Sequence, residues 1–136
     1  MSKNIEGQLS LFEAQHKLII TEDLKSYFRS FNANKYDLDM FAFYGFDQFK
    51  SVRDEVGDYG GAPNYTNIVN VLPAHERCFV FMEYFTHVSV YAIRLYEHSS
   101  SINEIYAICG DSFKVVANSF TEFLELYFSE DQSIYI

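Results

Sequence analysis

The chain has 136 residues, of which 49% are hydrophobic, and a formal net charge of -9. This length suits one domain with a sizeable core, and the content of 14 Phe and 11 Tyr excludes extensive disorder. The acidity argues against nucleic-acid binding, which depends on Lys and Arg at the phosphates, and favours a basic protein partner. Because the first residues include no apolar leader and Cys78 and Cys109 lack a CxxC spacing, we expect a cytoplasmic protein with reduced thiols.

The first part of the chain contains one strong helix signal. Residues 1–17 are polar with scattered apolar positions, so we expect a loose or short helical lead-in there and a single domain over residues 18–136. Thr21 is a typical N-cap, and acidic residues follow it in the first turn. The next apolar positions have helical spacing, at Leu24, Tyr27, Phe28 and Phe31. These features predict a helix that starts after Thr21.

The middle of the chain alternates between short elements and a loop. Residues 41–44 predict a short strand, and residues 47–56 predict a helix with Phe49, Val52 and Val56 on one face. Residues 57–67 hold three glycines, a proline and two asparagines, which indicate a loop.

Five apolar runs after the loop predict the strands of a sheet. They are rich in Val, Ile, Phe and Tyr and cover residues 68–73, 78–84, 89–96, 104–109 and 113–117. The connections between the later runs are short, which favours antiparallel neighbours over parallel strands. The expected fold is therefore α+β, with helices gathered on one side of an antiparallel sheet.

The aromatic segment SFTEFLELYF, residues 119–128, could be a membrane foot, a partner-seeking helix, a catalytic element or part of the core. Ser119 and Glu122 have the spacing of a capping box, so a helix should start at Phe120. Its apolar stripe contains Phe120, Phe123, Leu124, Tyr127 and Phe128. The segment covers only half of the roughly twenty residues of a bilayer span, and its polar face is acidic. We therefore expect a core helix, with a partner helix as the alternative.

The motifs for cofactors and metals are incomplete. The GDYGGAP stretch lacks the GK[ST] ending of a P-loop. His75 and Cys78 could share a metal, but a zinc site needs four ligands and no second pair lies nearby. Asp37 and Asp39 resemble the start of a calcium loop that lacks its glycine and closing glutamate. We expect no cofactor and no metal, and we expect ordinary histidines, each a candidate pH switch, at His16, His87 and His98.

The candidate catalytic groups are equally unspecific. Cys109 or Ser112 could act as a nucleophile only beside a base and an orienting acid. Cys109 ends an apolar strand, where a small buried cysteine is the commoner identity. Glu83 interrupts the apolar run FVFMEYF, and because a buried unpaired carboxylate is costly, we expect it at an edge or paired. The sequence therefore favours a protein that is not an enzyme.

Several segments, taken in order, resemble the SUKH superfamily, whose name partly refers to a yeast cell-wall regulator domain of the Smi/Knr type. The similarity covers about residues 18–129, and its most characteristic parts are residues 79–81 (FVF), 91–95 (YAIRL) and 105–123. The resemblance implies an α+β domain whose curved antiparallel sheet, of about five to six strands, is flanked by helices. For bacterial members it implies an immunity protein, or antitoxin, that binds and neutralises a toxin, often a nuclease, without chemistry of its own. A regulatory scaffold of the Smi/Knr type is the alternative, and a small hydrolase is the third hypothesis.

The candidate contacts with a toxin follow from charge and position. Carboxylates that flank loops or sheet edges could meet a basic cleft, and they are Asp54, Glu55, Asp58, Glu83, Glu104 and Asp111. Tyr59 and Tyr65 form an aromatic alternative. We expect a monomer or weak homo-oligomer with a protein partner, and no membrane or nucleic-acid partner.

Overall fold

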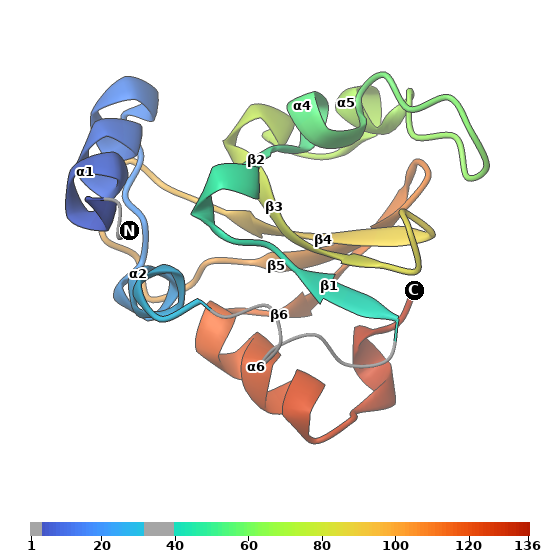
Figure 1. The fold of residues 1–136 in the computed structure, drawn as a ribbon. Helices are drawn as coiled ribbons and strands as arrows, with labels where there is room; N and C mark the ends of the chain where they lie inside the picture. Colours follow the sequence, from blue (N-terminus) through green and yellow to red (C-terminus); the bar gives the residue numbers. More distant parts are fainter. Residues whose placement is uncertain (1–3, 32–39) are drawn as a thin grey trace.

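The computed structural model describes residues 4–31 and 40–136, and the calcium-loop match at Asp37 and Asp39 lies outside them. The described residues form five α-helices and six strands (Figure 1). The helices are α1 (Ile5–His16), α2 (Glu22–Arg29), α4 (Val52–Val56), α5 (Ile68–Val71) and α6 (Phe120–Phe128). The strands are β1 (Phe41–Phe43), β2 (Lys50–Ser51), β3 (Cys78–Tyr84), β4 (Ser89–Arg94), β5 (Ile105–Cys109) and β6 (Ser112–Ala117). Within these ranges, no helix combines the length and apolarity that a bilayer crossing requires.

The six described strands belong to one open antiparallel sheet. Its order is β1-β3-β4-β5-β6, and β2 also pairs with β3. From β3 onward each strand pairs with the next one along the chain, as Phe79 with Ile93 and Tyr91 with Ala107 show. The predicted antiparallel meander and the α+β fold with a curved sheet are confirmed.

Helices cover both faces of the sheet, so the prediction that they gather on one side is wrong. Figure 1 shows α4 and α5 over one face, α6 under the other, and α1 and α2 at one end. Because side chains alternate along a strand, each face has its own core. The larger, aromatic core joins α1, α2 and α6 to the sheet and includes Leu9, Leu24, Phe81, Tyr91 and Phe123. The smaller core lies under α4 and α5 and includes Val52, Val56, Ile68, Val80 and Val90.

Two predictions for the middle of the chain are wrong. The run 68–73, expected as a strand, contains α5, because the amide of Leu72 bonds to the carbonyl of Ile68 and a helical turn forms. The helix expected over residues 47–56 covers only α4, since Lys50 and Ser51 pair with β3 instead. Such short apolar runs do not distinguish strand from helix by periodicity alone.

The N-terminal lead-in is a regular helix. Asn4 caps α1 by accepting a hydrogen bond from the amide of Gly7, and Leu9 and Phe12 are buried in the aromatic core. The predicted second helix is also present as α2. Thr21 occupies its N-cap position, but the hydroxyl donates to Asp23 and does not cap an amide.

The C-terminal aromatic segment is a core helix, as expected. Ser119 Oγ accepts a hydrogen bond from the amide of Glu122 at 3.0 Å, while the Glu122 carboxylate reaches the amide of Asn118. Phe120, Phe123 and Tyr127 are buried. Phe128 was predicted in the same stripe but is 54% exposed. Successive helical residues are separated by about 100°, so Phe128 points away from the face that Tyr127 buries.

Candidate functional site

A β-bulge in β3 determines where Glu83 points. The pairing of β3 with β4 shifts register between Val80 and Met82. Phe81 and Met82 both pack in the aromatic core as a result, although neighbouring strand residues normally face opposite sides. Beyond the bulge the alternation resumes, with Tyr84 against the aromatic core and Glu83 on the face that α4 covers.

The turn between β3 and β4 holds three successive residues in the left-handed region. The φ angles of Phe85, Thr86 and His87 are 49°, 51° and 65°. Each such conformation of a non-glycine residue costs of order 1–3 kcal/mol and persists only where the surrounding contacts hold it. The amide of Val88 closes the turn on the carbonyl oxygen of Tyr84 at 3.0 Å. Within this turn the His87 side chain meets a residue of α4.

The imidazole of His87 lies between two carboxylates. Its Nε2 is 2.8 Å from Glu55 Oε2, and its Nδ1 is 3.1 Å from Glu83 Oε1. The second contact lacks hydrogen-bond geometry, so Glu83 acts on the ring through its charge. The His87 side chain is 20% exposed and that of Glu55 only 8%. Each ring nitrogen of His87 therefore faces a carboxylate oxygen of the protein.

Glu55 connects the histidine to the sheet. Its Oε2 also accepts a hydrogen bond from the Tyr44 hydroxyl at 2.7 Å, and its Oε1 lies 3.6 Å from Lys50 Nζ. Ser51 caps α4 by accepting a hydrogen bond from the amide of Asp54, and this places Glu55 in the first turn. Burial, together with the bond to Glu55, raises the pKa of the Tyr44 phenol far above its ordinary value, so Tyr44 remains a hydrogen-bond donor.

Two further tyrosines enclose the histidine. The Tyr59 ring stacks on the His87 ring at 5.4 Å between centroids, with 26° between the planes. The Tyr65 hydroxyl donates to the carbonyl oxygen of His87 at 2.9 Å and so holds the strained turn. Tyr65 is completely buried, and this burial raises its pKa. We call Tyr44, Glu55, Tyr59, Tyr65, Glu83 and His87 the His87 cluster.

The structure brings four of the predicted contact residues together in this cluster: Glu55, Tyr59, Tyr65 and Glu83. Glu55 and Tyr65 were expected to contact a partner, but their side chains are buried and engaged within the protein, so we correct that expectation. Glu83 is paired, which was one of its two predicted states.

The other four predicted residues lie elsewhere. Asp54 and Asp58 are exposed and line a hollow of about 410 Å³ beside α4 and α5. Asp111 accepts a hydrogen bond from the side-chain amide of Asn67 at 3.1 Å. Glu104 lies apart from these, where it accepts a hydrogen bond from the Tyr96 hydroxyl.

Sequence reasoning named His87 only as an ordinary histidine and candidate pH switch, and it did not place His87 or Tyr44 beside Glu55. The only local signal for His87 is the spacing of four residues from Glu83, and that spacing indicates proximity in a helix, not in a hairpin turn. Tyr44 was assigned only to a strand. Its bond to Glu55 depends on how β1 and α4 pack, which no local pattern reports.

The histidine and cysteine considered for a metal have other contacts. His75 lies 3.5 Å from Glu76, and burial raises the pKa of the Cys78 thiol to about 12, which keeps it protonated. In the described part of the chain, no three His, Cys, Asp or Glu side chains are grouped so that they could hold a metal.

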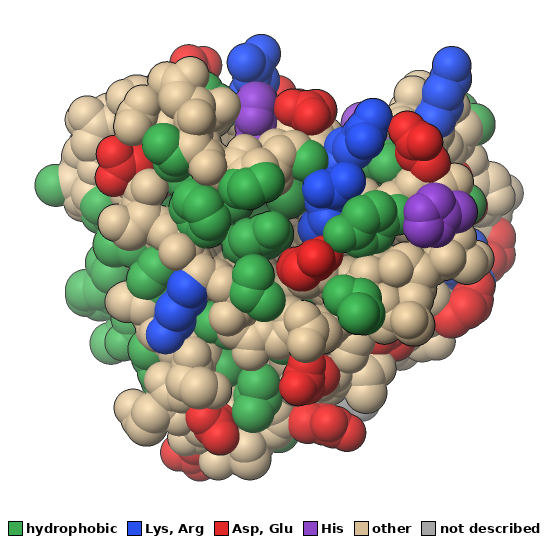
Figure 2. Space-filling model, turned by 180° about the vertical axis from the view of Figure 1, so that it is seen from behind, with side chains coloured by type: hydrophobic (Ala, Val, Ile, Leu, Met, Phe, Trp, Pro, Cys, Tyr) green, Lys and Arg blue, Asp and Glu red, His purple; other side chains and the backbone are tan. Residues whose placement is uncertain are grey.

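The acidic side chains are not gathered into one patch on the face that Figure 2 shows. Figure 2 shows the face behind the view of Figure 1, where apolar side chains gather at the centre and acidic side chains are scattered among other types. That face offers no continuous acidic patch. The exposed carboxylates of Asp54, in α4, and Asp58, just after it, are therefore a more specific candidate for partner binding than the overall charge.

Comparisons of the chain with known protein families, with curated proteins and with solved structures found no match.

Proposed function

We propose that this chain is a non-enzymatic binding protein of the immunity type, which neutralises a basic toxin domain by direct contact. The observation that carries the proposal is the pair of exposed carboxylates of Asp54 and Asp58 on and after α4. Neither makes a side-chain hydrogen bond or ion pair within the described residues. Unpaired carboxylates remain available to the cationic groups of a partner.

The support beneath α4 makes these carboxylates suitable for recognition. Glu55 points inward from the same helix and contacts His87, Tyr44 and Lys50. The outward side chains are therefore mounted on an element that is fixed to the sheet. Groups that are already ordered lose less conformational entropy when a partner binds.

The net charge of -9 supports the same proposal. A nuclease that grips phosphates carries a basic cleft, and opposite charges accelerate the encounter of two proteins. The expected complex forms quickly at low salt and more slowly as salt screens the attraction.

The His87 cluster is also the strongest argument for an enzyme, because it combines an imidazole, two carboxylates and three tyrosines. A general base, however, needs a nitrogen that is free to accept a proton from a substrate. Both nitrogens of His87 face carboxylates of the protein. We therefore favour a structural brace over hydrolase chemistry.

The test begins with a search of the genes next to the gene for this chain for a toxin domain, which is then produced and used as the binding partner. Coexpression of the chain should protect cells from this toxin. The double variant Asp54→Lys, Asp58→Lys should associate about tenfold more slowly and show a weaker dependence on salt. The double variant Glu125→Lys, Glu130→Lys, at exposed positions on and after α6, is the matched control, since both double variants change the charge by the same amount.

Absence of binding to that toxin domain would refute the immunity proposal. Wild-type association rates for the double variant would refute the role of α4. Turnover of model esters or nucleotides that disappears in Cys109→Ala would show instead that the chain is an enzyme.

A further inference from the structure

A groove separates α1 from the segment that leads into α4. It has a volume of about 340 Å³, and its lining includes four phenylalanines, Phe12, Phe46, Phe49 and Phe79. The lining also includes Asp47, from this segment, and Asp54, from the first turn of α4. Of the residues that line this groove, the proposed function uses only Asp54.

Four phenylalanine rings that contact one another form the floor of the groove. Phe12 and Phe49 are 7% exposed and Phe79 1%, so the half-buried Phe46 presents most of the accessible ring surface. Phe49 stacks on Phe79 with 5.4 Å between ring centroids. The Phe12 centroid lies 5.5 Å from that of Phe49 and 5.0 Å from that of Phe79. Phe46 extends the floor, 5.8 Å from Phe12. The faces of aromatic rings carry partial negative charge and attract cations that approach them. The floor therefore suits a flat cationic group better than an anion.

The acidic groups at the groove are not neutralised by the protein. Within the described residues, the side chains of Asp47 and Asp54 make no hydrogen bond or ion pair. Lys50 also lines the groove, but its Nζ lies 3.6 Å from Glu55 Oε1. His16 packs its ring on Phe12 at 4.3 Å. The groove thus retains two carboxylates for a cationic ligand.

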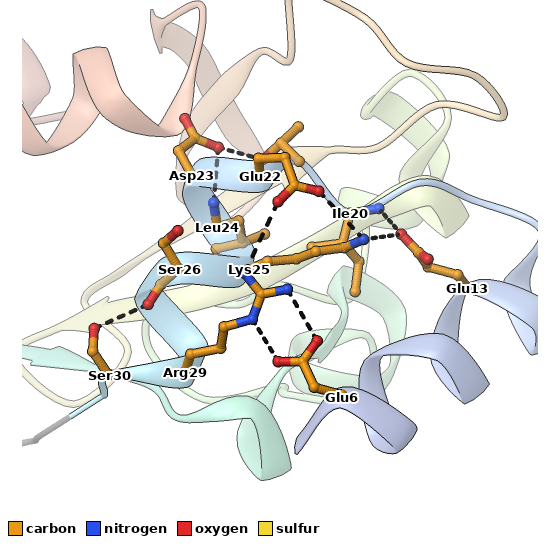
Figure 3. Close-up of polar contacts among 11 residues, drawn as sticks. Glu6, Glu13, Ile20, Glu22, Asp23, Leu24, Lys25, Ser26, Arg29 and Ser30 are labelled. Atoms are coloured by element: carbon orange, nitrogen blue, oxygen red, sulfur yellow. Dashed lines mark hydrogen bonds and ion pairs between the residues drawn. The ribbon is translucent and has the colours of Figure 1, made fainter. Parts of the chain in front are cut away.

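The α1 wall of the groove is fixed to the rest of the protein. Figure 3 shows Glu6 and Glu13 of α1 directed toward α2 and the residues before it. Glu6 forms two hydrogen bonds with the guanidinium of Arg29, at 2.6 and 3.0 Å. Glu13 accepts a hydrogen bond from the amide of Ile20 at 2.8 Å and lies 3.3 Å from Lys25 Nζ. A ligand would therefore meet a groove that is already formed.

We propose that this groove receives an arginine side chain of a protein partner. Its guanidinium would lie against the phenylalanine floor and pair with Asp47 and Asp54. Arginine fits better than lysine because its planar group stacks on aromatic rings, is weakly hydrated and binds carboxylates through two parallel hydrogen bonds. The inference rests on the proposed function for the identity of the partner, since a basic toxin presents arginines and Asp54 also lies on the proposed contact surface.

The binding step can be tested without the toxin. Titration of the isotope-labelled protein with N-acetyl-arginine amide, followed by NMR, should shift the resonances of Phe12, Phe46 and Asp47. The matched probe is N-acetyl-citrulline amide, which has nearly the same shape but no charge. We expect it to bind about tenfold or more weakly, because a hydrogen bond between charged groups is lost.

Variants separate the groove from general electrostatic attraction. Asp47→Asn with Asp54→Asn should weaken arginine binding about tenfold or more, whereas Glu125→Gln with Glu130→Gln should leave it unchanged. All four positions are exposed, so each variant should keep the native spectrum. Equal affinity for arginine and citrulline, or shifts that map outside the groove, would overturn the inference.

The same probes distinguish this inference from the proposed function. If the toxin binds and Asp54→Lys slows its association, but arginine amide does not shift the groove resonances, the immunity proposal stands and the arginine site is wrong. If arginine amide binds in the groove but the toxin does not bind, the site stands and the proposed partner is wrong.

Discussion

Removal of the Glu55 carboxylate tests whether the His87 cluster braces the fold. Glu55 accepts a hydrogen bond from the Tyr44 hydroxyl at 2.7 Å and contacts His87 Nε2 at 2.8 Å. Its side chain is only 8% exposed, so water cannot readily replace these contacts. Glu55→Ala would leave the buried Tyr44 hydroxyl without its acceptor and His87 with Glu83 alone.

The size of the effect follows from these contacts. A hydrogen bond to a charged group contributes about 1.5–3 kcal/mol, and the Glu55 carboxylate takes part in two, with the Tyr44 hydroxyl and with His87 Nε2. We expect Glu55→Ala to lower the free energy of unfolding by about 3–5 kcal/mol. Tyr44→Phe removes one donor and should cost about 1.5–3 kcal/mol. The double variant should cost less than the sum, because both changes remove the same hydrogen bond.

Urea denaturation followed by circular dichroism measures these changes. Asp54→Ala is the matched control, since this neighbour in α4 is exposed and should change stability by no more than about 0.5 kcal/mol. If Glu55→Ala and Asp54→Ala were equally mild, the cluster would not brace the fold. Additive effects of Tyr44→Phe and Glu55→Ala would show that the two side chains do not interact.

Two further predictions concern the core and the response to alkali. Ser119→Ala removes the cap of α6 and should lower the free energy of unfolding by about 1 kcal/mol. Phe123 is fully buried, so Phe123→Ala should lower it by about 3–5 kcal/mol. Equal small losses in a urea titration would mean that α6 is not packed. Burial raises the pKa of Tyr91 above the ordinary value of 10.0, so above that pH the unfolded state loses a proton that the folded state keeps, and stability should fall as pH rises. Tyrosinate absorbance should then appear partly together with unfolding, and complete ionisation of a still folded protein would contradict this reasoning.

The elements that were predicted correctly are those with a strong local signal. The capping box at Ser119 and the spacing of Phe120, Phe123 and Tyr127 define α6 without reference to the rest of the chain. The strands from residue 78 onward are long apolar runs separated by short connections. By contrast, α5 has only four residues, and its apolar run resembles a strand.

The candidate sites depend on contacts between distant segments. The His87 cluster joins Glu55 of α4, Glu83 of β3 and His87 of a hairpin turn. The three residues of this turn with positive φ angles include no glycine or asparagine, so the sequence does not predict its conformation. The groove combines α1 with residues 46–54 and 79. Its walls come from the lead-in, which was expected to be loose or a short helix, and from a segment that was assigned to one helix. The resemblance to the SUKH superfamily remains an expectation.

The bulge in β3 makes the number of residues in this strand as important as their identity. A substitution of Phe81 would remove one core side chain and leave every other residue on its own face. Deletion of Phe81 would remove the extra residue, restore simple alternation and leave Glu83 and Tyr84 on their present faces, whereas one residue inserted between Met82 and Glu83 would exchange those faces. We therefore expect homologous chains to vary in the apolar residue at this position or to lack it, while selection removes single-codon insertions in the part of β3 that follows it.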